Sequence, residues 1–376
     1  MQIKIESPEE KELLKSLAAK QDPESKRMVR FLNMPDLSRT PESPLYVLVE
    51  SALKIKNLKD FDVIEIPEIV PVDVSFDLFD FAPDHPVRSK SDTYYADEKN
   101  ILRTHDTVMW YYYLKHPATK EKIEKKETLG VICYGKVFRK DEIDRKHMNI
   151  FHQFGGLYLQ PDIKGVMPVE KLKEVLHEIV ETLFGKDTKY RFLDDIFPYT
   201  DPSLQIEVKV GNNWVEIMGG GMPKKSVLKK MGLEGYNGWA FGFGLERLAI
   251  ISMELPDIRL LWSADERVKK QLKLGNKFKE VSKFPPITRD ISFVVPNSFI
   301  PNNYFDLIRD LGGDIVEEVK LIDKYENKEK FGADKVSYTY RIIYRSNDRT
   351  LTNEEVDAIQ KKVYGETAKQ FGAELR

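Results

Sequence analysis

Residues 238–247 read GWAFGFGLER, and the fold expected for the chain is built around them. Glycines that alternate with apolar side chains predict a buried strand that another backbone or a ligand approaches closely. The apolar run at residues 248–251 follows as the start of a helix would. Arg247 then lies at a strand-to-helix junction, where its permanent charge and its fork of N–H donors match phosphate oxygens. A buried strand with an ordinary ion-paired arginine explains the same residues equally well.

The composition is that of a globular protein. The chain has 376 residues, 41% of them hydrophobic and 32% charged, which is enough for two or three domains. Its net charge of −2 excludes a global basic field, so any contact with nucleic acid has to be local. Cys133 is the single cysteine, which excludes a disulfide framework and a cysteine-based metal cluster, and favours a reducing compartment.

No apolar run reaches the length of a membrane span, so no membrane partner is expected. The first ten residues are too acidic for a signal or transit peptide. We therefore predict a cytoplasmic protein. The mitochondrial matrix is the alternative if a cleaved leader precedes this sequence.

The N-terminal third predicts mixed structure. A short helix is expected over residues 9–20, followed by an extended lead-in as far as residue 40. Ser43-Pro44 begins a helix with one apolar face, and residues 61–67 and 91–95 are predicted to be strands.

A long charged connection separates two apolar runs, residues 129–138 and 150–159, which we predict to be neighbouring strands. The connection, residues 139–149, contains eight charged or titratable side chains, among them Arg139 and His147. A hairpin loop this long and this charged is unusual and indicates a binder of polyanions. A solvated hairpin tip would be the commoner interpretation without Arg247.

The remaining pattern predicts an α+β protein. An amphipathic helix over residues 169–183 and strands over 204–210 and 214–218 indicate an antiparallel sheet flanked by helices, not a Rossmann fold. The glycine triplet at 219–221 lacks the Lys-Ser/Thr of a phosphate-binding Walker loop. From residue 284 onward, a β-α-β-β-α order predicts a ferredoxin-like split βαβ sandwich. This module has 14 Lys and Arg against 16 Asp and Glu, so it is not globally basic.

Two landmarks together resemble the class II aminoacyl-tRNA synthetases: Phe138-Arg139-x-Asp141 and Gly242-x-Gly244-x-Glu246-Arg247. More narrowly, the chain resembles the single-chain, mitochondrial-type phenylalanyl-tRNA synthetases. Matching landmarks lie at residues 82–86, 102–105, 137–153, 196–203 and 238–249. The tail resembles their ferredoxin-fold anticodon-binding domain. The implied organisation is an N-terminal extension (1–42), a class II catalytic domain (43–269), a basic linker (270–283) and an anticodon-binding domain (284–376).

The resemblance implies an ATP-dependent ligase that activates phenylalanine as an adenylate and transfers it to the 3′-terminal adenosine of tRNA(Phe). Such chemistry depends on positioning and on neutralising charge, with no obligatory protein nucleophile. ATP and Mg²⁺ are the implied cofactors, and a monomer is the implied state. One alternative is a paralogue that activates another aromatic acid. Another is a catalytically altered tRNA-binding homologue. Such proteins tend to lose the two arginines that bind ATP in the family, whereas the matching Arg139 and Arg247 are both present here.

The resemblance also implies roles for nucleotide-binding residues. Arg139 would hold the α-phosphate and the amino-acid carboxylate, and Arg247 the γ-phosphate of a bent ATP. Asp141 would contact the adenine amino group, and Phe151 would sandwich the base with Arg247. The other implied residues are His147 on the phosphate tail, Gly244 in the ATP site and Glu216 as a Mg²⁺ ligand.

The implied amino-acid site is aromatic. Phe197 and Tyr199 would embrace a phenyl ring edge to face, a packing that contributes about 0.5–1.5 kcal/mol beyond buried area. Ala240 would form the floor of the site. Positions near the amino and carboxylate groups are matched by Tyr95, His105, Thr107 and Gln153. Ordinary core packing is the alternative for Phe197 and Tyr199.

Two positions depart from the family pattern. Gly155 stands where the family usually has glutamate, and Trp110 stands at or near a usual glutamine. Both missing side chains help to bind the substrate ammonium. We predict that Trp110 fills the volume left at Gly155, and that Asp106 supplies the missing negative charge.

Further expectations concern tRNA. Lys277, Lys279 and Lys283 in the linker are candidates for contacts with tRNA phosphates. Tyr304, Tyr338 and Tyr340 are candidates for stacking on anticodon bases, with packing as the commoner role of such tyrosines.

Overall fold

The computed structural model describes residues 1–280, 284–332 and 334–376, and the chain forms two compact units. Unit 1 comprises Met1–Phe138 and Ile150–Met253, and unit 2 comprises Arg139–Asn149 and Glu254–Arg376. The domain boundaries expected from the sequence stay predictions. The expected linker reaches into residues 281–283, which lie outside the described residues.

Unit 1 is built on an eight-stranded sheet with the order β1-β2-β5-β6-β10-β9-β8-β7. Its strands are β1 (Gln2–Lys4), β2 (Asp62–Glu65), β5 (Leu129–Phe138), β6 (Ile150–Pro161), β7 (Tyr190–Asp195), β8 (Thr200–Val210), β9 (Asn213–Pro223) and β10 (Tyr236–Gly244). In this order, each strand from β5 to β7 pairs antiparallel with the next one across the sheet. The pairs β1-β2 and β2-β5 are parallel. The predicted antiparallel sheet is therefore confirmed, with a parallel edge to which the first residues of the chain contribute a strand.

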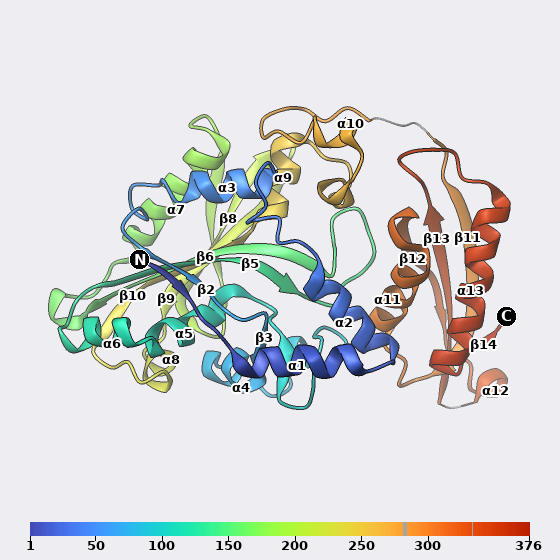
Figure 1. The fold of residues 1–376 in the computed structure, drawn as a ribbon, viewed down its shortest axis with the longest axis horizontal. Coiled ribbons are helices and arrows are strands. Elements are labelled where there is room, and N and C mark those ends of the chain that lie inside the picture. Colours follow the sequence, from blue (N-terminus) through green and yellow to red (C-terminus); the bar gives the residue numbers. More distant parts are fainter. Residues whose placement is uncertain (281–283, 333) are drawn as a thin grey trace. The chain divides into compact units, whose positions relative to one another are not determined.

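Helices cover both faces of this sheet (Figure 1). On one face lie α3 (Pro44–Ala52), α7 (Val169–Phe184) and α9 (Leu245–Met253); on the other lie α5 (Met109–Lys115), α6 (Pro117–Glu124) and α8 (Lys225–Lys230). Ser43 caps α3 as predicted, because its side chain accepts the Leu45 N–H at 3.2 Å. The face under α5 and α8 holds a buried apolar cluster that includes Trp110, Cys133 and Ala240.

Two predictions for the N-terminal third are wrong. The expected extended lead-in contains helix α2 (Pro23–Asn33), which follows helix α1 (Pro8–Ala19). Asp22 caps α2 by accepting the Ser25 N–H at 2.8 Å, and Pro23 occupies the first helical position. Residues 91–95 are not a strand, since the chain turns about Ser89 and only Tyr95 forms a bridge, to Ile101. The short elements β3 (Ile69–Pro71), α4 (Val72–Ser75) and β4 (Asn100–Leu102) complete this region.

Unit 2 has the predicted ferredoxin-like order. It contains β11 (Ile287–Pro296), α11 (Pro301–Gly312), β12 (Val316–Tyr325), β13 (Lys335–Tyr344), α13 (Asn353–Phe371) and β14 (Glu374–Leu375), with short helices α10 (Glu266–Lys269) and α12 (Lys328–Phe331). The sheet order is β12-β13-β11-β14. The sequence did not predict β14, whose two residues add the last strand of the motif by pairing with β11. A capping box of Thr352 and Glu355 begins α13 where the sequence placed it.

The charged connection between β5 and β6, residues 139–149, packs into unit 2. Ile143 is 3% exposed in the apolar core of this unit, and its carbonyl accepts the Val319 N–H at 3.1 Å. Arg309 of α11 donates to the carbonyl of Glu142 at 2.8 Å and to the Asn149 side chain. The interpretation of this connection as a solvated hairpin tip is therefore wrong, because buried apolar and hydrogen-bonded groups hold it.

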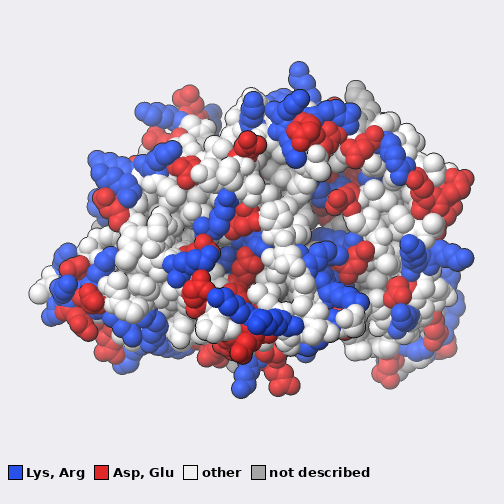
Figure 2. All heavy atoms as spheres, viewed as in Figure 1, with Lys and Arg blue, Asp and Glu red and all other residues white. Residues whose placement is uncertain are grey.

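No helix of the described residues combines the length and the apolar character needed to cross a lipid bilayer. Lys and Arg alternate with Asp and Glu over the face drawn in Figure 2, in keeping with the net charge of −2.

Asp62 gives unit 1 an acid-sensitive contact. Burial acts to raise the pKa of Asp62, but hydrogen bonds from Lys122 Nζ at 2.7 Å and the Tyr113 hydroxyl at 2.6 Å outweigh burial and lower the pKa. The contribution of Asp62 to stability is thus present above its unfolded pKa of about 3.9 and is lost as pH falls through the lower folded value. We expect Asp62→Asn to lower the urea midpoint at pH 7 and to flatten the decline of that midpoint below about pH 4. If the urea midpoints of the wild type and of Asp62→Asn declined in parallel below about pH 4, Asp62 would not be the source of the acid sensitivity.

Candidate active site

Three glycines lie in register across the middle of the unit 1 sheet. Gly155 on β6 pairs with Gly242 on β10, and Gly242 pairs with Gly219 on β9. Paired residues on neighbouring strands point to the same face of a sheet, so the three positions form one row without side chains. We call this set the glycine row. If residue 242 carried a β-carbon, the nearest described atoms apart from its chain neighbours would be the two carboxylate oxygens of Asp106. The nearer oxygen would lie 3.6 Å away, and no other such atom would lie within 4 Å.

Asp106 lies at the Gly155 end of the glycine row. It begins the turn Asp106–Val108 that leads into α5, and its backbone N–H donates to Gln153 Oε1 at 2.9 Å. The side chain is nearly buried, with 5% of the residue exposed. A β-carbon at position 155 would collide with Asp106 Oδ2 and lie 2.9 Å from its Cγ. Asp106, not Trp110, therefore occupies the space above Gly155, and the predicted volume exchange with Trp110 is wrong.

Aromatic rings lie at the Gly219 end of the row. A β-carbon at Gly219 would lie 2.7 Å from Phe197 Cζ, so the ring rests on the glycine backbone. The rings of Phe197 and Tyr199 are stacked, with centroids 6.0 Å apart and planes at 14°. Tyr199 also meets Trp110 edge to face at 5.8 Å and 89°. The two predicted aromatic residues are thus brought together above the sheet, and Trp110 packs against one of them.

Sequence reasoning missed Phe79 and Phe81 as part of this aromatic group. Phe79 meets Tyr199 edge to face at 5.7 Å, and Phe81 stacks on His105 at 5.8 Å. His105 Nε2 also lies 3.2 Å from the Ser75 carbonyl. The sequence carries a signal in Phe79-x-Phe81, just before the landmark at residues 82–86, but only the folded chain brings these two rings against Tyr199 and His105.

The other predicted amino-acid-site residues lie around the same group. Tyr95 donates its hydroxyl to the Arg88 carbonyl at 2.6 Å, and burial raises its pKa. Thr107 follows Asp106 in the turn, half-buried. Ala240 is 5% exposed and lies on β10 two residues before Gly242, which places its side chain on the same face as the glycine row.

Arg247 and Glu216 meet at the surface of unit 1. Arg247 is in the first turn of α9, and its Nη1 donates to the Glu216 carbonyl at 2.8 Å and lies 3.8 Å from Glu216 Oε1. Both side chains are about half exposed, at 48% and 51%. At Gly244, just before the helix, an added β-carbon would meet nothing within 4 Å among the described residues. The arrangement leaves a permanent cation and open backbone where an anion can approach.

A buried, hydrogen-bonded histidine–glutamate pair lies directly before Arg247. Glu246 Oε1 lies 2.6 Å from His152 Nδ1, and the His152 backbone N–H donates to Glu246 Oε2 at 2.8 Å. His152 Nε2 accepts the Leu37 N–H at 3.0 Å, which assigns the proton of a neutral imidazole to Nδ1. This pair links helix α9 to β6 and to the chain after α2, and so fixes the start of the helix that carries Arg247.

Family models match nearly the whole chain. The class II core domain of tRNA synthetases matches residues 33–272, and the ferredoxin-fold anticodon binding domain matches residues 282–376. The chain belongs to the class II tRNA synthetases. The two sheets described above are therefore the sheet of a class II core and that of a ferredoxin-fold anticodon-binding domain.

Curated relatives of this synthetase are phenylalanine–tRNA ligases. The chloroplastic/mitochondrial enzyme of Arabidopsis thaliana is 39% identical over 83% of this chain and 72% of its own length. The mitochondrial enzyme of Mus musculus is 34% identical over 83% of this chain and 74% of its own length. The mitochondrial enzyme of Saccharomyces cerevisiae is 32% identical over 80% of each chain.

The other residues predicted to bind the nucleotide are divided between the two units. Phe151 lies on β6 of unit 1, whereas Arg139, Asp141 and His147 belong to unit 2. The joint hold of Arg139 and Arg247 on one nucleotide therefore stays a prediction. The Arg139 N–H donates to the Asn149 carbonyl at 3.0 Å, which closes the base of the loop.

His147 is tied to Asp144 within the loop of unit 2. His147 Nδ1 lies 2.8 Å from Asp144 Oδ2, and the His147 N–H donates to Oδ1 at 2.8 Å. Burial acts to raise the pKa of Asp144, but the hydrogen bonds from residues 146 and 147 outweigh it and lower the pKa. The loop therefore holds the histidine side chain through a carboxylate.

The tRNA expectations need correction in part. Tyr304, Tyr338 and Tyr340 are 0%, 7% and 1% exposed in the core of unit 2, so stacking on bases is wrong and packing is their role. Lys277 pairs with Glu254 at 2.5 Å. Lys283 lies outside the described residues.

Glu216 is the predicted ligand for Mg²⁺. Among the described residues, no group of three or more His, Cys, Asp or Glu side chains is placed to hold a metal ion. A single exposed carboxylate fits Mg²⁺ nevertheless, because this ion keeps several waters and is usually bound by one or two carboxylates plus substrate phosphates.

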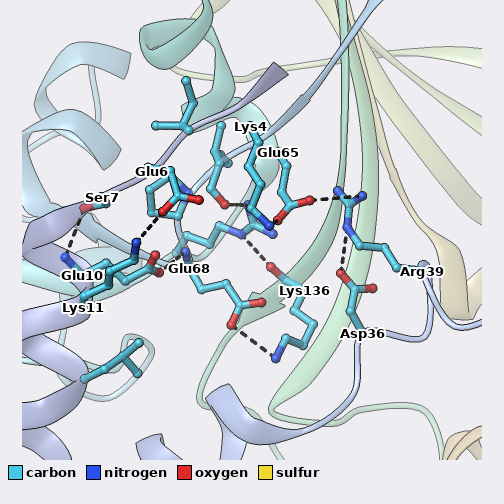
Figure 3. Close-up of a pocket in the computed structure, with 15 residues that line it drawn as sticks. Lys4, Glu6, Ser7, Glu10, Lys11, Asp36, Arg39, Glu65, Glu68 and Lys136 are labelled. Atoms are coloured by element: carbon cyan, nitrogen blue, oxygen red, sulfur yellow. Dashed lines mark hydrogen bonds and ion pairs between the residues drawn. The ribbon is translucent and has the colours of Figure 1, made fainter. Parts of the chain in front are cut away.

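A charged pocket of about 490 Å³ lies elsewhere in unit 1, between the N-terminal helices and the sheet edge (Figure 3). Opposite charges pair across it: Lys4 with Glu65 at 2.8 Å, and Lys136 with Glu68 at 3.2 Å. Burial raises the pKa of Glu68. None of the predicted site residues lines this pocket, so it is separate from the glycine row.

Proposed function

We propose that this protein is a phenylalanine–tRNA ligase that forms phenylalanyl-adenylate from phenylalanine and ATP and transfers the phenylalanyl group to the 3′-terminal adenosine of tRNA(Phe). The observation that carries the proposal is the glycine row, with a carboxylate at one end and stacked aromatic rings at the other. A zwitterionic aromatic amino acid has the matching pattern of ammonium and ring. The names of the curated relatives support the same substrate.

The residues would act by holding charge. Arg247 would bind the γ-phosphate and Arg139 the α-phosphate and the substrate carboxylate, which places the reacting oxygen near phosphorus. Phe151 would stack on the adenine, Asp141 would accept from its amino group, and Gly244 would let the backbone approach the nucleotide. Mg²⁺, when bound, supplies neutralisation of the phosphate charge, and Glu216 would hold it together with ATP. His147 would contact the phosphate tail.

Phe197, Tyr199 and Ala240 would form the pocket for the phenyl ring. His105, Thr107, Gln153 and Tyr95 would surround the amino and carboxylate groups. The anticodon-binding domain would contact tRNA in residues 284–376, after a catalytic domain at 43–269 and a linker at 270–283. We propose a monomer with no membrane partner. The mitochondrial names of the relatives favour the organellar alternative for its location over the cytoplasm.

Pyrophosphate exchange with a panel of amino acids tests the proposal. Phenylalanine should support ATP–pyrophosphate exchange, and tyrosine should support at least about 10-fold less, because a pocket closed by packed rings disfavours a para hydroxyl. Exchange that prefers another aromatic acid would favour the paralogue. An absence of exchange with every amino acid, in a protein that binds tRNA(Phe), would favour a non-catalytic homologue.

A further inference from the structure

We propose that Asp106 is the group that binds the substrate ammonium, and that Gly155 is the position that makes room for it. The negative charge of the amino-acid site then comes from the turn before α5 and not from the sheet. This inference rests on the proposed function and names how that site recognises an α-amino acid.

The carboxylate and a side chain at position 155 exclude each other. Asp106 Oδ2 occupies the space where a β-carbon at 155 would lie, and Asp106 Cγ is 2.9 Å from it. Contacts under 3.0 Å force a neighbour to move, and here the Phe241 carbonyl closes the same space from the β10 side at 3.1 Å. Only glycine at 155 is compatible with this placement of Asp106.

The local structure fixes the carboxylate over the glycine row. The Asp106 backbone N–H donates to Gln153 Oε1 at 2.9 Å, which ties the turn to β6 two residues before Gly155. The residue is 5% exposed, so an ammonium bound there would meet the carboxylate with little competing water. Charge-assisted hydrogen bonds are stronger in such surroundings than in bulk solvent.

The length of the row suits an aromatic amino acid. Gly155 and Gly219 are two strand spacings apart, about 9.6 Å. Asp106 lies over the first of these positions and Phe197 over the last. An amino acid lying along the row would place its ammonium at Asp106 and its ring against Phe197 and Tyr199, above the backbone of Gly242.

A purely structural role for Asp106 is the competing account. An acidic residue in the first turn of a helix stabilises it through the helix dipole. That role predicts a loss of thermal stability in Asp106→Asn with unchanged substrate recognition, so the two accounts differ in a measurable way.

The experiment compares Asp106→Asn with the wild type, using phenylalanine and its des-amino analogue 3-phenylpropionate. We expect the KM for phenylalanine in pyrophosphate exchange to rise about 10- to 100-fold, the effect of losing a charged hydrogen bond. The kcat and the KM for ATP should stay within about threefold. Calorimetric affinity for 3-phenylpropionate should not fall, because this analogue has no ammonium. Asp62→Asn, also a buried aspartate of unit 1, is the matched control and should leave the KM for phenylalanine unchanged.

A second pair of variants moves the carboxylate from position 106 to position 155. Gly155→Glu alone should lose phenylalanine binding, since its side chain collides with Asp106. The double variant Asp106→Ala/Gly155→Glu should recover at least about 10-fold of the lost affinity. Wild-type exchange with phenylalanine, together with an unchanged KM in Asp106→Asn, would overturn this inference and leave the proposed function standing. A wild type that neither exchanges nor binds phenylalanine would overturn both.

Discussion

Arg247→Ala should lower phenylalanine-dependent pyrophosphate exchange by about 10²- to 10³-fold, the usual effect of removing one preorganised group that stabilises transition-state charge. Arg247 is positioned before substrate binds, because Nη1 donates to the Glu216 carbonyl at 2.8 Å and α9 holds its backbone. The loss should therefore appear in kcat as well as in the KM for ATP. The exchange rate of Arg247→Lys should fall between those of the wild type and Arg247→Ala, since lysine keeps the charge but not the planar fork of donors.

The matched control for this prediction is Arg191→Ala. Arg191 is also a half-exposed arginine of unit 1, and it also pairs with a glutamate of a neighbouring strand, Glu207, at 2.6 Å. No role at the substrates is assigned to it, so exchange should stay near the wild-type rate. If Arg247→Ala also kept exchange near that rate, Arg247 would be an ordinary ion-paired arginine, as the sequence alone allowed.

Glu246→Ala should destabilise unit 1 by about 1–3 kcal/mol for each of the two buried N–H donors that it leaves without an acceptor. Glu246 is 3% exposed and His152 is fully buried, and the Glu246 carboxylate accepts hydrogen bonds from both the ring and the backbone of His152. The measurement is the shift of the urea midpoint at pH 7. Glu246→Gln should cost less, because an amide oxygen still accepts from the backbone N–H.

An exposed histidine–glutamate pair provides the comparison. Glu181 lies 3.6 Å from His177 on the surface of α7, and Glu181→Ala should change stability by no more than about 1 kcal/mol. Equal urea midpoints for Glu246→Ala and Glu181→Ala would show that burying the Glu246–His152 pair contributes nothing to the stability of unit 1. Because α9 also carries Arg247, Glu246→Ala should slow exchange even under conditions where the protein stays folded.

Much of the fold could be predicted from local patterns. The apolar runs at 129–138 and 150–159 became β5 and β6 with nearly the predicted ends, because buried strands of this length are specified by their own side chains. Helix α13 was predicted residue for residue, since its capping box is a local signal. The missed helix α2 has a comparable local signal in its capping residue Asp22 and in Pro23, which follows it.

The site was less accessible to prediction. The sequence placed Asp106 near the substrate but assigned the space at Gly155 to Trp110. The register of β6 with β10, and the turn before α5, decide instead that the carboxylate fills that space. Likewise, the exposure of the charged loop at 139–149 could not be read from its composition, because Ile143 is buried by residues more than 140 positions away.

The family, the two kinds of sheet and most candidate residues follow from the sequence alone, because they depend on short motifs and on the periodicity of apolar side chains. Which of those residues meet depends on the three-dimensional fold. Three glycines from three strands align into one row, and a carboxylate and an aromatic pair take its two ends. The physical reason is that strand register and side-chain packing join residues far apart in the chain, and no local pattern specifies such contacts.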